Sequence, residues 1–360
     1  MKKGLSLKLK GISFTLCLIF LCLQKSLAAE PYVINYTTYK FENSWFAQLN
    51  KDLIEALEEK SDHRLKVNLQ IQSDHLNYPD FVAQVEAGDM DMALVSYEGL
   101  YAYSPKFQSL YAPYLFESYT LAHHVIDNYI HSWLNEELIS SNVFVFSIFD
   151  LGFRQFTTKD IDVKTVDDLH NVKIASSALT GIMEAVSAFG AVPEDVSFTE
   201  LYSSLKNNEI QGQEHTLSAI EALKLYEVQN RLILTNHVFM TMPLIINKKF
   251  LDTLPADLQD ILYEVVLKIQ QENRQRIVQE ELNYIENLQS HGMTVQRPKI
   301  ESFVNSVDAA YNALQRTVGE QDMISLLFEI NSARYEIMSE NQKAHEDDEE
   351  SMDDNDYEDE

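Results

Sequence analysis

The sequence predicts an α/β protein with two lobes, and three observations lead to this prediction. Segments with the spacing of β-strands alternate with segments with the spacing of helices, which favours sheets covered by helices. The chain has 360 residues, enough for two hydrophobic cores. A helical segment of roughly 36 residues follows Pro255 without a breaker, and at 1.5 Å per residue it is about 54 Å long. Such a helix is longer than one lobe is wide, so we expect it to lie across both.

The first 28 residues are predicted to be a secretory signal rather than part of the fold. Four lysines among the first ten residues precede an apolar stretch from Ile12 to Leu23, which is too short to span a bilayer comfortably. The small residues Ser26 and Ala28 place the cleavage after Ala28 or one residue later. A retained membrane anchor is the alternative. The exported protein is then expected to be periplasmic.

Cysteine and charge exclude several classes of function. Cys17 and Cys22 both lie in the predicted signal, so the exported chain has no thiol or disulfide and must fold on its apolar core alone. The formal charge is −28, and such an acidic surface repels nucleic acid and anionic lipid.

Residues 341–360 are too acidic and too poor in apolar residues to fold, so we expect a solvated, disordered tail. A docking or cation-binding role for this tail is the alternative.

The first elements alternate between strand and helix. Periodicity and caps predict a strand at 32–38, a helix capped by Asn43 or Ser44, a strand at 65–72, a helix at 79–86 that stops at Gly88, and a strand at 91–96. Strands separated by helices in this way favour parallel sheets.

The same alternation begins again after a buried strand at 143–149. Sequence patterns predict a capped helical turn at 165–169, a strand at 172–177, helices at 181–189 and 200–206, a strand at 239–247, and the long helix from Pro255 to Gly292. The alternation therefore supports a second lobe.

Signatures of enzymes and metal sites are absent from the sequence. It contains no G-x-S-x-G, no P-loop and no H-E-x-x-H, and the exported chain has no cysteine to serve as a nucleophile or ligand. His123 and His124 are adjacent on a predicted helix, so they point in different directions and do not form a metal pair. We expect neither an enzyme nor a bound metal or cofactor.

Two segments carry polar residues where a ligand could bind. Arg154 follows the buried strand at 143–149, and the carboxyl ends of parallel strands open into the ligand crevice of α/β sheets. Its guanidinium could hold a carboxylate by paired hydrogen bonds, or it could pair with a neighbouring acid such as Asp150. The segment "QGQEHT" (211–216) is either a solvated turn or a set of donors directed at a ligand.

Several motifs resemble one known family in the same order and spacing. The segments "GFRQFTT", "TVDDLHNVKI", "FGAVPEDVSFTELYSSLKNNEIQGQEHT", "LYEVQNRLILTNH" and "LPADLQDIL" resemble the dicarboxylate-type periplasmic solute-binding proteins of TRAP transporters. The resemblance covers about residues 32–338 and is most specific from Arg154 to Leu262. It implies a Venus-flytrap fold whose cleft binds a small organic acid and delivers it to membrane subunits driven by an ion gradient.

The resemblance also implies a division of the chain and a hinge. Lobe I is predicted to comprise residues 29–151 plus 240–279, and lobe II residues 152–239 plus 280–340. We expect the hinge strands near Leu151 and Met240 to absorb the motion when a ligand closes the cleft.

The chain departs from the family pattern at two positions of the predicted cleft. Ala175 stands where the family has an arginine that binds the substrate carboxylate, and His215 replaces an asparagine that faces the ligand. Arg154 matches a second cleft arginine. Gln213 and Glu214 are expected to hold the turn, with Gly212 allowing a backbone conformation closed to larger residues. The predicted ligand-binding residues are Arg154, His215, Gln213, Phe198, Tyr97, Thr37, Tyr39 and Ser177, and core packing stays the alternative for each aromatic side chain.

These features predict the solute-binding subunit of a TRAP transporter. A sensory module for a membrane receptor would use the same cleft, so it stays as an alternative. A scaffold that kept the fold and lost its ligand is a second alternative, favoured by Ala175 and the acidic tail. A hydrolytic enzyme lacks any paired nucleophile and base.

Overall fold

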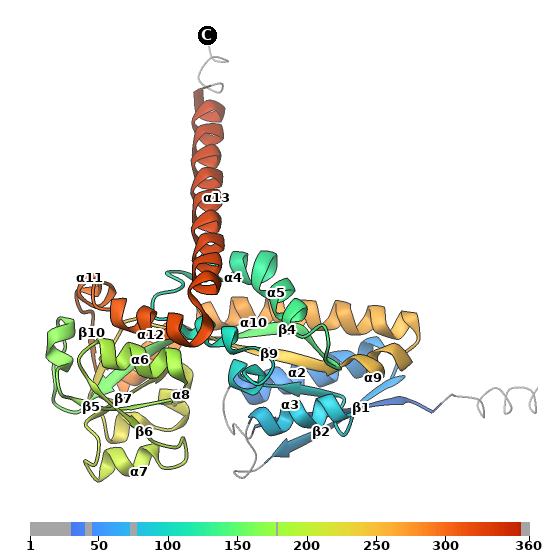
Figure 1. Cartoon of the computed structure of the whole chain (residues 1–360), viewed down its shortest axis with the longest axis horizontal. Helices are drawn as coiled ribbons and strands as arrows, with labels where there is room; N and C mark the ends of the chain where they lie inside the picture. Colours follow the sequence, from blue (N-terminus) through green and yellow to red (C-terminus); the bar gives the residue numbers. More distant parts are fainter. Residues whose placement is uncertain (1–29, 40–44, 73–77, 178, 354–360) are drawn as a thin grey trace, which may run out of the picture.

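The computed structural model describes residues 30–39, 45–72, 78–177 and 179–353 (Figure 1). Their strands form a ten-stranded sheet in the order β2-β1-β3-β9-β4-β7-β5-β6, with β8 beside β4 and β10 beside β8. The α/β class is confirmed. The strands are β1 (Tyr32–Tyr39), β2 (Leu65–Gln72), β3 (Met92–Leu94), β4 (Val143–Thr158), β5 (Lys173–Ser176), β6 (Val192–Asp195), β7 (Gly212–Thr216), β8 (Arg231–Ile233), β9 (Phe239–Asn247) and β10 (Thr294–Gln296).

Helices cover this sheet. The α-helices are α2 (Trp45–Lys60), α3 (Tyr78–Ala87), α4 (Tyr119–Val125), α5 (His131–Glu137), α6 (Thr180–Ala188), α7 (Leu201–Lys206), α8 (Leu217–Ala222), α9 (Lys248–Thr253), α10 (Ala256–Ser290), α11 (Ile300–Val304), α12 (Asp308–Val318) and α13 (Glu320–Asp353). Short 3-10 turns include η1 (Tyr97–Leu100), η2 (Pro105–Tyr111) and η4 (Val166–Leu169), and a π-helical turn, η3, covers Ile126–Ile130.

Strand directions differ from the parallel arrangement that the alternation predicts. β1 is parallel to β2 and β3, and β5 is parallel to β6 and β7. The central strands are antiparallel: β4 to β9, β7 and β8, and β9 to β3. The reason is the path of the chain, which enters the second half of the sheet along β4 and returns along β9. We call β2, β1, β3, β9 and residues 143–153 of β4 the first half-sheet, and the remaining strands with residues 154–158 the second.

β4 is one strand of 16 residues, so the prediction that a strand ends at residue 149 with Arg154 beyond it is wrong. Its register changes partner: Phe153 still pairs with β9, whereas Arg154 pairs with Thr216 of β7. A bulge falls between Asp150 and Gly152, and Gly152 has a φ of 92°. Bulges bend a strand locally, so β4 bends close to the point where it passes between the half-sheets.

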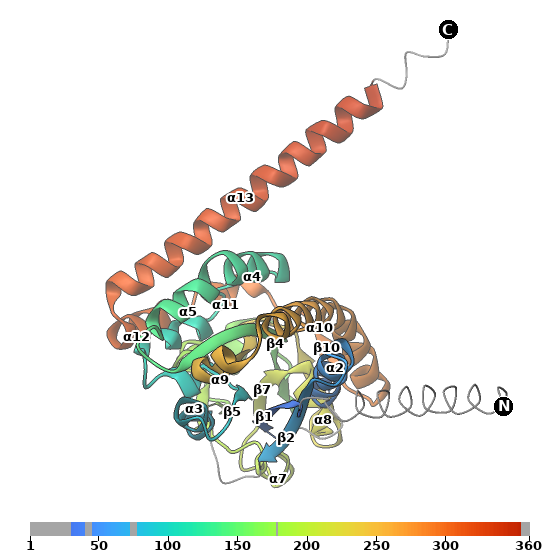
Figure 2. The same ribbon diagram turned by 90° about the vertical axis from the view of Figure 1, so that its right-hand side faces the viewer.

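α10 is 35 residues long, which confirms the predicted long helix, and it contacts α2, β4 and α8 (Figure 2). Two of its buried amides hydrogen-bond the backbone of β4 beside the bulge. Gln270 Nε2 donates to Ile148 O at 2.9 Å, and Asn273 Oδ1 accepts from Asp150 N at 2.8 Å. These bonds give two backbone groups of β4 a side-chain partner on α10.

Each half-sheet packs on apolar clusters. In the first, Leu53 of α2 and Leu258 of α10 belong to one cluster, and Phe81 of α3 belongs to another. In the second, α6 contributes Val186 to one cluster and α7 contributes Leu205 to another. The helices thus bury their apolar stripes against the sheet, as the spacing in the sequence predicts.

The C-terminal region departs from the prediction in one respect. α13 continues to Asp353, so residues 341–353, which were expected to be disordered, are helical. Near the start of α13, Leu326 shares a core cluster with Val125 of α4. The lobe boundaries stay a prediction, and the predicted signal segment lies outside the described residues. In the part of the chain that is described, every helix is too short or too polar to span a bilayer.

Candidate functional site

A cavity of about 410 Å³ lies between the two half-sheets. Its walls come from β1, η1 and β9 on one side and from β5, β7, α8 and the segment before α7 on the other. The lining residues are Tyr39, Tyr78, Ser96, Glu98, Leu151, Arg154, Ala175, Ser176, Ser177, Leu179, Val196, Ser197, Phe198, Thr199, Leu201, Glu214, His215, Thr216, Ser218, Ala219, Ala222, Met240 and Met242. A cavity of this size fits a small metabolite.

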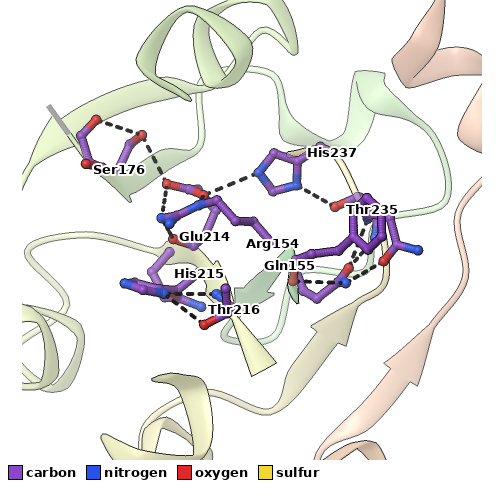
Figure 3. Close-up of polar contacts among 12 residues, drawn as sticks. Arg154, Gln155, Ser176, Glu214, His215, Thr216, Thr235 and His237 are labelled. Atoms are coloured by element: carbon purple, nitrogen blue, oxygen red, sulfur yellow. Dashed lines mark hydrogen bonds and ion pairs between the residues drawn. The ribbon is translucent and has the colours of Figure 1, made fainter. Parts of the chain in front are cut away.

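Arg154 and Glu214 form a buried ion pair on the wall of this cavity (Figure 3). Arg154 Nη2 donates to Glu214 Oε1 at 2.9 Å and to the Glu214 carbonyl at 2.8 Å, and Nε donates to Oε2. Because Arg154 pairs with Thr216, two residues beyond Glu214, the two side chains are diagonal neighbours across β4 and β7. Arg154 therefore pairs with an acid, as one alternative held, but with Glu214 and not Asp150.

Two further side chains hydrogen-bond the Glu214 carboxylate. Ser176 Oγ donates to Oε1 at 3.2 Å, and His237 Nε2 lies 3.3 Å from Oε2. Burial by itself would raise the pKa of Glu214, but the positive charge of Arg154 and the hydrogen bonds outweigh burial and lower the pKa to about 2. Glu214 is therefore ionised at neutral pH, and its charge compensates that of Arg154.

His237 is held in one tautomer by its neighbours. Burial lowers the pKa of His237, so the ring is neutral. With Nε2–H directed at Glu214, Nδ1 accepts from the hydroxyl of Thr235 at 2.8 Å. Gln155 fixes this loop, because its Oε1 accepts from the backbone N–H groups of Thr235 and Asn236 at 2.8 and 3.0 Å. The ion pair thus rests on side chains from β4, β5, β7 and the loop before β9.

His215 contributes a neutral imidazole to the cavity. Burial, with a contribution from Arg154, lowers its pKa to about 3. Its Nδ1 accepts from the Thr216 backbone N–H at 2.9 Å, so Nε2 carries the proton and is a hydrogen-bond donor. The ring meets Phe198 edge to face, with centroids 5.5 Å apart.

The rest of the polar lining is dominated by hydroxyl groups. Ser96, Ser177, Ser197, Thr199 and Ser218 all line the cavity. Such groups both donate and accept hydrogen bonds. Together with the His215 imidazole, they suit a ligand that carries hydroxyls of its own.

Glu98 adds a carboxylate from the first half-sheet's side. Burial raises the pKa of Glu98, and the charge of Asp195, the last residue of β6 in the second half-sheet, raises it further. Desolvation and a like charge both favour the protonated form.

Five of the eight predicted ligand-binding residues line the cavity: Arg154, His215, Phe198, Tyr39 and Ser177. The remaining three do not line it and make other contacts. Thr37 Oγ1 donates to Gln70 O at 3.1 Å, the hydroxyl of Tyr97 accepts from Thr241 Oγ1 at 3.0 Å, and Gln213 Nε2 donates to Thr157 Oγ1 at 3.0 Å.

The segment 211–216 is not a turn. Gly212 to Thr216 form β7 between β4 and β5. The reason for a glycine at 212 is also different from the prediction, since its backbone conformation is not left-handed. A Cβ there would lie 2.5 Å from Thr157 O and 2.8 Å from Ile174 Cδ1, so neighbouring strands approach too closely for a side chain.

Ser176, Glu98 and Gln155 were missed by the sequence analysis. Ser176 is the last residue of β5, and the end of a strand next to the predicted crevice was the available signal. Glu98 lies in a segment without a binding motif in the sequence, and only the packing of the two half-sheets brings it to the cavity. Gln155 lies next to Arg154 in the sequence, but its role depends on the distant residues Thr235 and Asn236. His123 bonds the buried Asp150 at 2.6 Å, whereas His124 contacts Glu336. Within the described ranges, no three His, Cys, Asp or Glu residues gather as metal ligands would.

A two-lobed sheet with a solute-sized cavity between its halves defines a solute-binding protein. The family model described as "Bacterial extracellular solute-binding protein, family 7" matches residues 37–317, and the chain belongs to this family. It is an extracytoplasmic family of solute-binding proteins that work with TRAP transporter membrane subunits, and it is not a class of enzymes. The resemblance seen in the sequence is confirmed, and the sensory and scaffold alternatives are not favoured.

Individual relatives are distant in sequence but similar over most of their length. The 2,3-diketo-L-gulonate-binding periplasmic protein of Escherichia coli is 26% identical over 80% of this chain and 88% of its own. The sialic acid-binding periplasmic protein of Vibrio cholerae is 23% identical over 75% and 84%. The C4-dicarboxylate-binding protein of Bacillus subtilis is 23% identical over 83% and 86%.

Solved structures share the fold. A TRAP solute-binding protein of Fusobacterium nucleatum with bound sn-glycerol-3-phosphate has a TM-score of 0.77 at 22% identity, over 85% of this chain and 99% of its own. The sugar acid binding protein of Advenella mimigardefordensis in complex with galactonate has a TM-score of 0.76 at 22% identity, over 84% and 99%.

Proposed function

We propose that the cavity between the half-sheets captures a small hydroxylated organic acid, with Arg154 and His215 holding its acid group. The observation that carries this proposal is which nitrogens of the Arg154 guanidinium are already hydrogen-bonded. Glu214 uses Nε and Nη2 and fixes the plane of the group. Among the described residues none accepts a hydrogen bond from Nη1, although Arg154 lines the cavity. A fixed guanidinium with one free nitrogen is a preorganised donor for a ligand oxygen.

The ion pair limits how much charge the site offers to the ligand. Because Glu214 neutralises Arg154 and Ala175 supplies no cation, the site attracts a charged ligand only weakly. Hydrogen bonds supply most of the binding free energy. His215 Nε2 adds a second donor, and the serine and threonine hydroxyls bond the ligand's own hydroxyls. We therefore expect a ligand with one acid group and several hydroxyls. The site should bind such a hydroxylated monoacid more tightly than a dicarboxylate without hydroxyls.

The names of the relatives support this ligand class. They include proteins that bind 2,3-diketo-L-gulonate and sialic acid, and solved structures hold galactonate and D-erythronate. Each of these compounds carries one acid group with hydroxyls. A C4-dicarboxylate binder is also among the relatives, but the alanine at 175 separates this chain from the family's usual carboxylate-binding pattern.

Capture is a conformational step without covalent chemistry. Ligand contacts to both half-sheets stabilise the closed arrangement by their differential energy. The bulge at Leu151, opposite Met240 in β9, supplies the place where the crossing strands bend. The exported protein acts in the periplasm after removal of residues 1–28, and it releases its ligand to the membrane subunits.

The proposal is tested by identifying the ligand and then weakening one donor. Mass spectrometry of small molecules released from freshly purified, denatured protein should find a hydroxylated monoacid. Calorimetry with that compound should show at least about a tenfold weaker affinity for Arg154→Lys, because lysine keeps the charge beside Glu214 but loses the fork.

Arg231→Lys is the matched control. Arg231 also bonds an acid, Asp162, at 2.6 Å, but it lies outside the cavity lining. The Arg231→Lys variant should bind the ligand with the same affinity as the unmodified protein. An unchanged affinity in Arg154→Lys, or a released ligand without an acid group, would contradict the proposal.

A further inference from the structure

α13 differs from the other long helix because it projects away from the body (Figures 1 and 2). Its first turns pack against α4 and α12, and the residues that face the core are buried there: Met323, Leu326, Ile330 and Ala333. This face explains how the helix is anchored. It does not explain the apolar residues on its other face.

The exposed face of α13 carries a second set of large apolar residues. Ile324, Phe328, Tyr335 and Met338 are 48%, 66%, 76% and 64% exposed. With the exposed Asn331 between them, the five positions follow one another at steps of four, three, four and three residues. At about 100° per residue they lie within an arc of about 80°. We call these five residues the α13 seam.

The spacing of the seam specifies the kind of partner. Alternating steps of three and four keep apolar residues on one line only when two helices wind around each other. Scattered exposed apolar residues need no explanation, but a continuous line on a projecting helix indicates a contact surface. A partner must therefore offer a helix with the same spacing, and this chain offers one in its own α13.

We propose that the α13 seam pairs two copies of this chain in an antiparallel helix dimer. Charge decides the orientation. Six of the eight residues from Glu346 to Asp353, the end of α13, are Asp or Glu, and parallel helices would place two such runs side by side, where they repel. Antiparallel helices keep the two runs at opposite ends of the contact.

The seam is complementary to itself in this orientation. A two-fold axis at Asn331 places the two Asn331 amides together, and an amide both donates and accepts hydrogen bonds. Phe328 then lies near the partner's Tyr335, and Ile324 near the partner's Met338. A single polar residue in an apolar seam is a known means of fixing register.

Dimerisation through α13 leaves solute capture unobstructed. None of the residues that line the cavity belongs to α13, so each protomer keeps its own site. The proposal is therefore independent of which ligand the cavity takes. Its consequence for transport is a particle that carries two solute molecules.

The oligomeric state gives the first test. Sedimentation equilibrium of the exported chain should show a mass twice that of one protomer, and Phe328→Glu with Tyr335→Glu should halve it. The matched control is Val278→Glu with Leu282→Glu on α10, where the side chains are 46% and 61% exposed. This control adds the same charge to another long helix and should stay dimeric. A monomeric unmodified protein, or a dimeric seam variant, would overturn the proposal.

Cysteine cross-linking tests the orientation, because the exported chain has no cysteine of its own. Asn331→Cys should form a disulfide-linked dimer on mild oxidation. Ile324→Cys should not, because two copies of residue 324 would lie about 21 Å apart along an antiparallel pair. Cross-linking of both variants would show a parallel pair, and cross-linking of neither would show that the seam is not the interface. Circular dichroism checks that each variant is folded.

Discussion

The two halves of β4 belong to the same strand but depend on different kinds of interaction. Before residue 154 the strand contributes mainly apolar side chains to the cores, including Val145, Ile148 and Phe149. From Arg154 to Thr158 it buries four polar side chains out of five residues. Buried apolar groups need only volume and shape, whereas buried polar groups need particular partners.

This difference shows where substitution is restricted. The polar half depends on Glu214 and on the loop that carries His237, which lie far away in the sequence. Removing the Glu214 carboxylate leaves the Arg154 charge without compensation, and removing the His237 ring leaves Glu214 without one of its hydrogen bonds. In the apolar half, the loss of stability grows with the side-chain volume that a substitution removes.

Arg154→Met should lower the free energy of unfolding by about 3–5 kcal/mol, because it leaves the Glu214 carboxylate buried without its cation. Adding Glu214→Gln should restore much of this loss, since the double variant contains no unpaired charge. Urea unfolding followed by circular dichroism measures both. Equal stability of the single and double variants would mean that the pair does not act as a unit.

Acid should weaken the polar half selectively. Glu214 has a folded pKa of about 2 against an ordinary value of 4.5, so the unfolded state binds a proton first as the pH falls. The stabilisation is complete above about pH 4.5 and is lost as the pH falls towards 2, amounting to on the order of 3 kcal/mol. Urea unfolding from pH 7 to pH 2.5 should show a steeper loss for the unmodified protein than for the double variant. Parallel curves would contradict this assignment.

Ile148→Val should have the smallest effect, a loss of about 1 kcal/mol, because it removes one buried methylene group from the apolar half. Ligand affinity should not change, since Ile148 lies outside the cavity lining. Calorimetry and urea unfolding check the two parts. A loss as large as that of Arg154→Met would remove the distinction between the halves.

Much of the fold could be predicted because local patterns carry it. The bounds of β9 were predicted at 239–247 and are Phe239–Asn247, and the long helix was predicted from Pro255 and is Ala256–Ser290. A cap, a breaker and a regular apolar period mark these elements within a few residues. Arg154 and His215, which also line the cavity, were expected there because of the resemblance to the family and not because of such local signals.

Two of the errors share one physical cause. Polar residues usually end a strand, so "RQFTT" and "QGQEHT" were interpreted as segments outside the sheet. In the folded chain they are β-strands, because Arg154 and Glu214 satisfy each other across β4 and β7. The extension of α13 into the acidic segment has a related explanation. A helix that is already anchored by packing grows without a new nucleation step.

The sequence by itself determined the α/β class and the order of the elements, since these depend on neighbours in the chain, while Arg154 and His215 were expected at the ligand through the resemblance to the family. Only the tertiary structure decided that Glu214 compensates Arg154, that Ser176 and Glu98 join the cavity, and that α13 presents an open apolar seam. Those properties depend on contacts between residues that are far apart in the sequence. Such contacts decide whether a buried charge is compensated and whether an apolar face is covered.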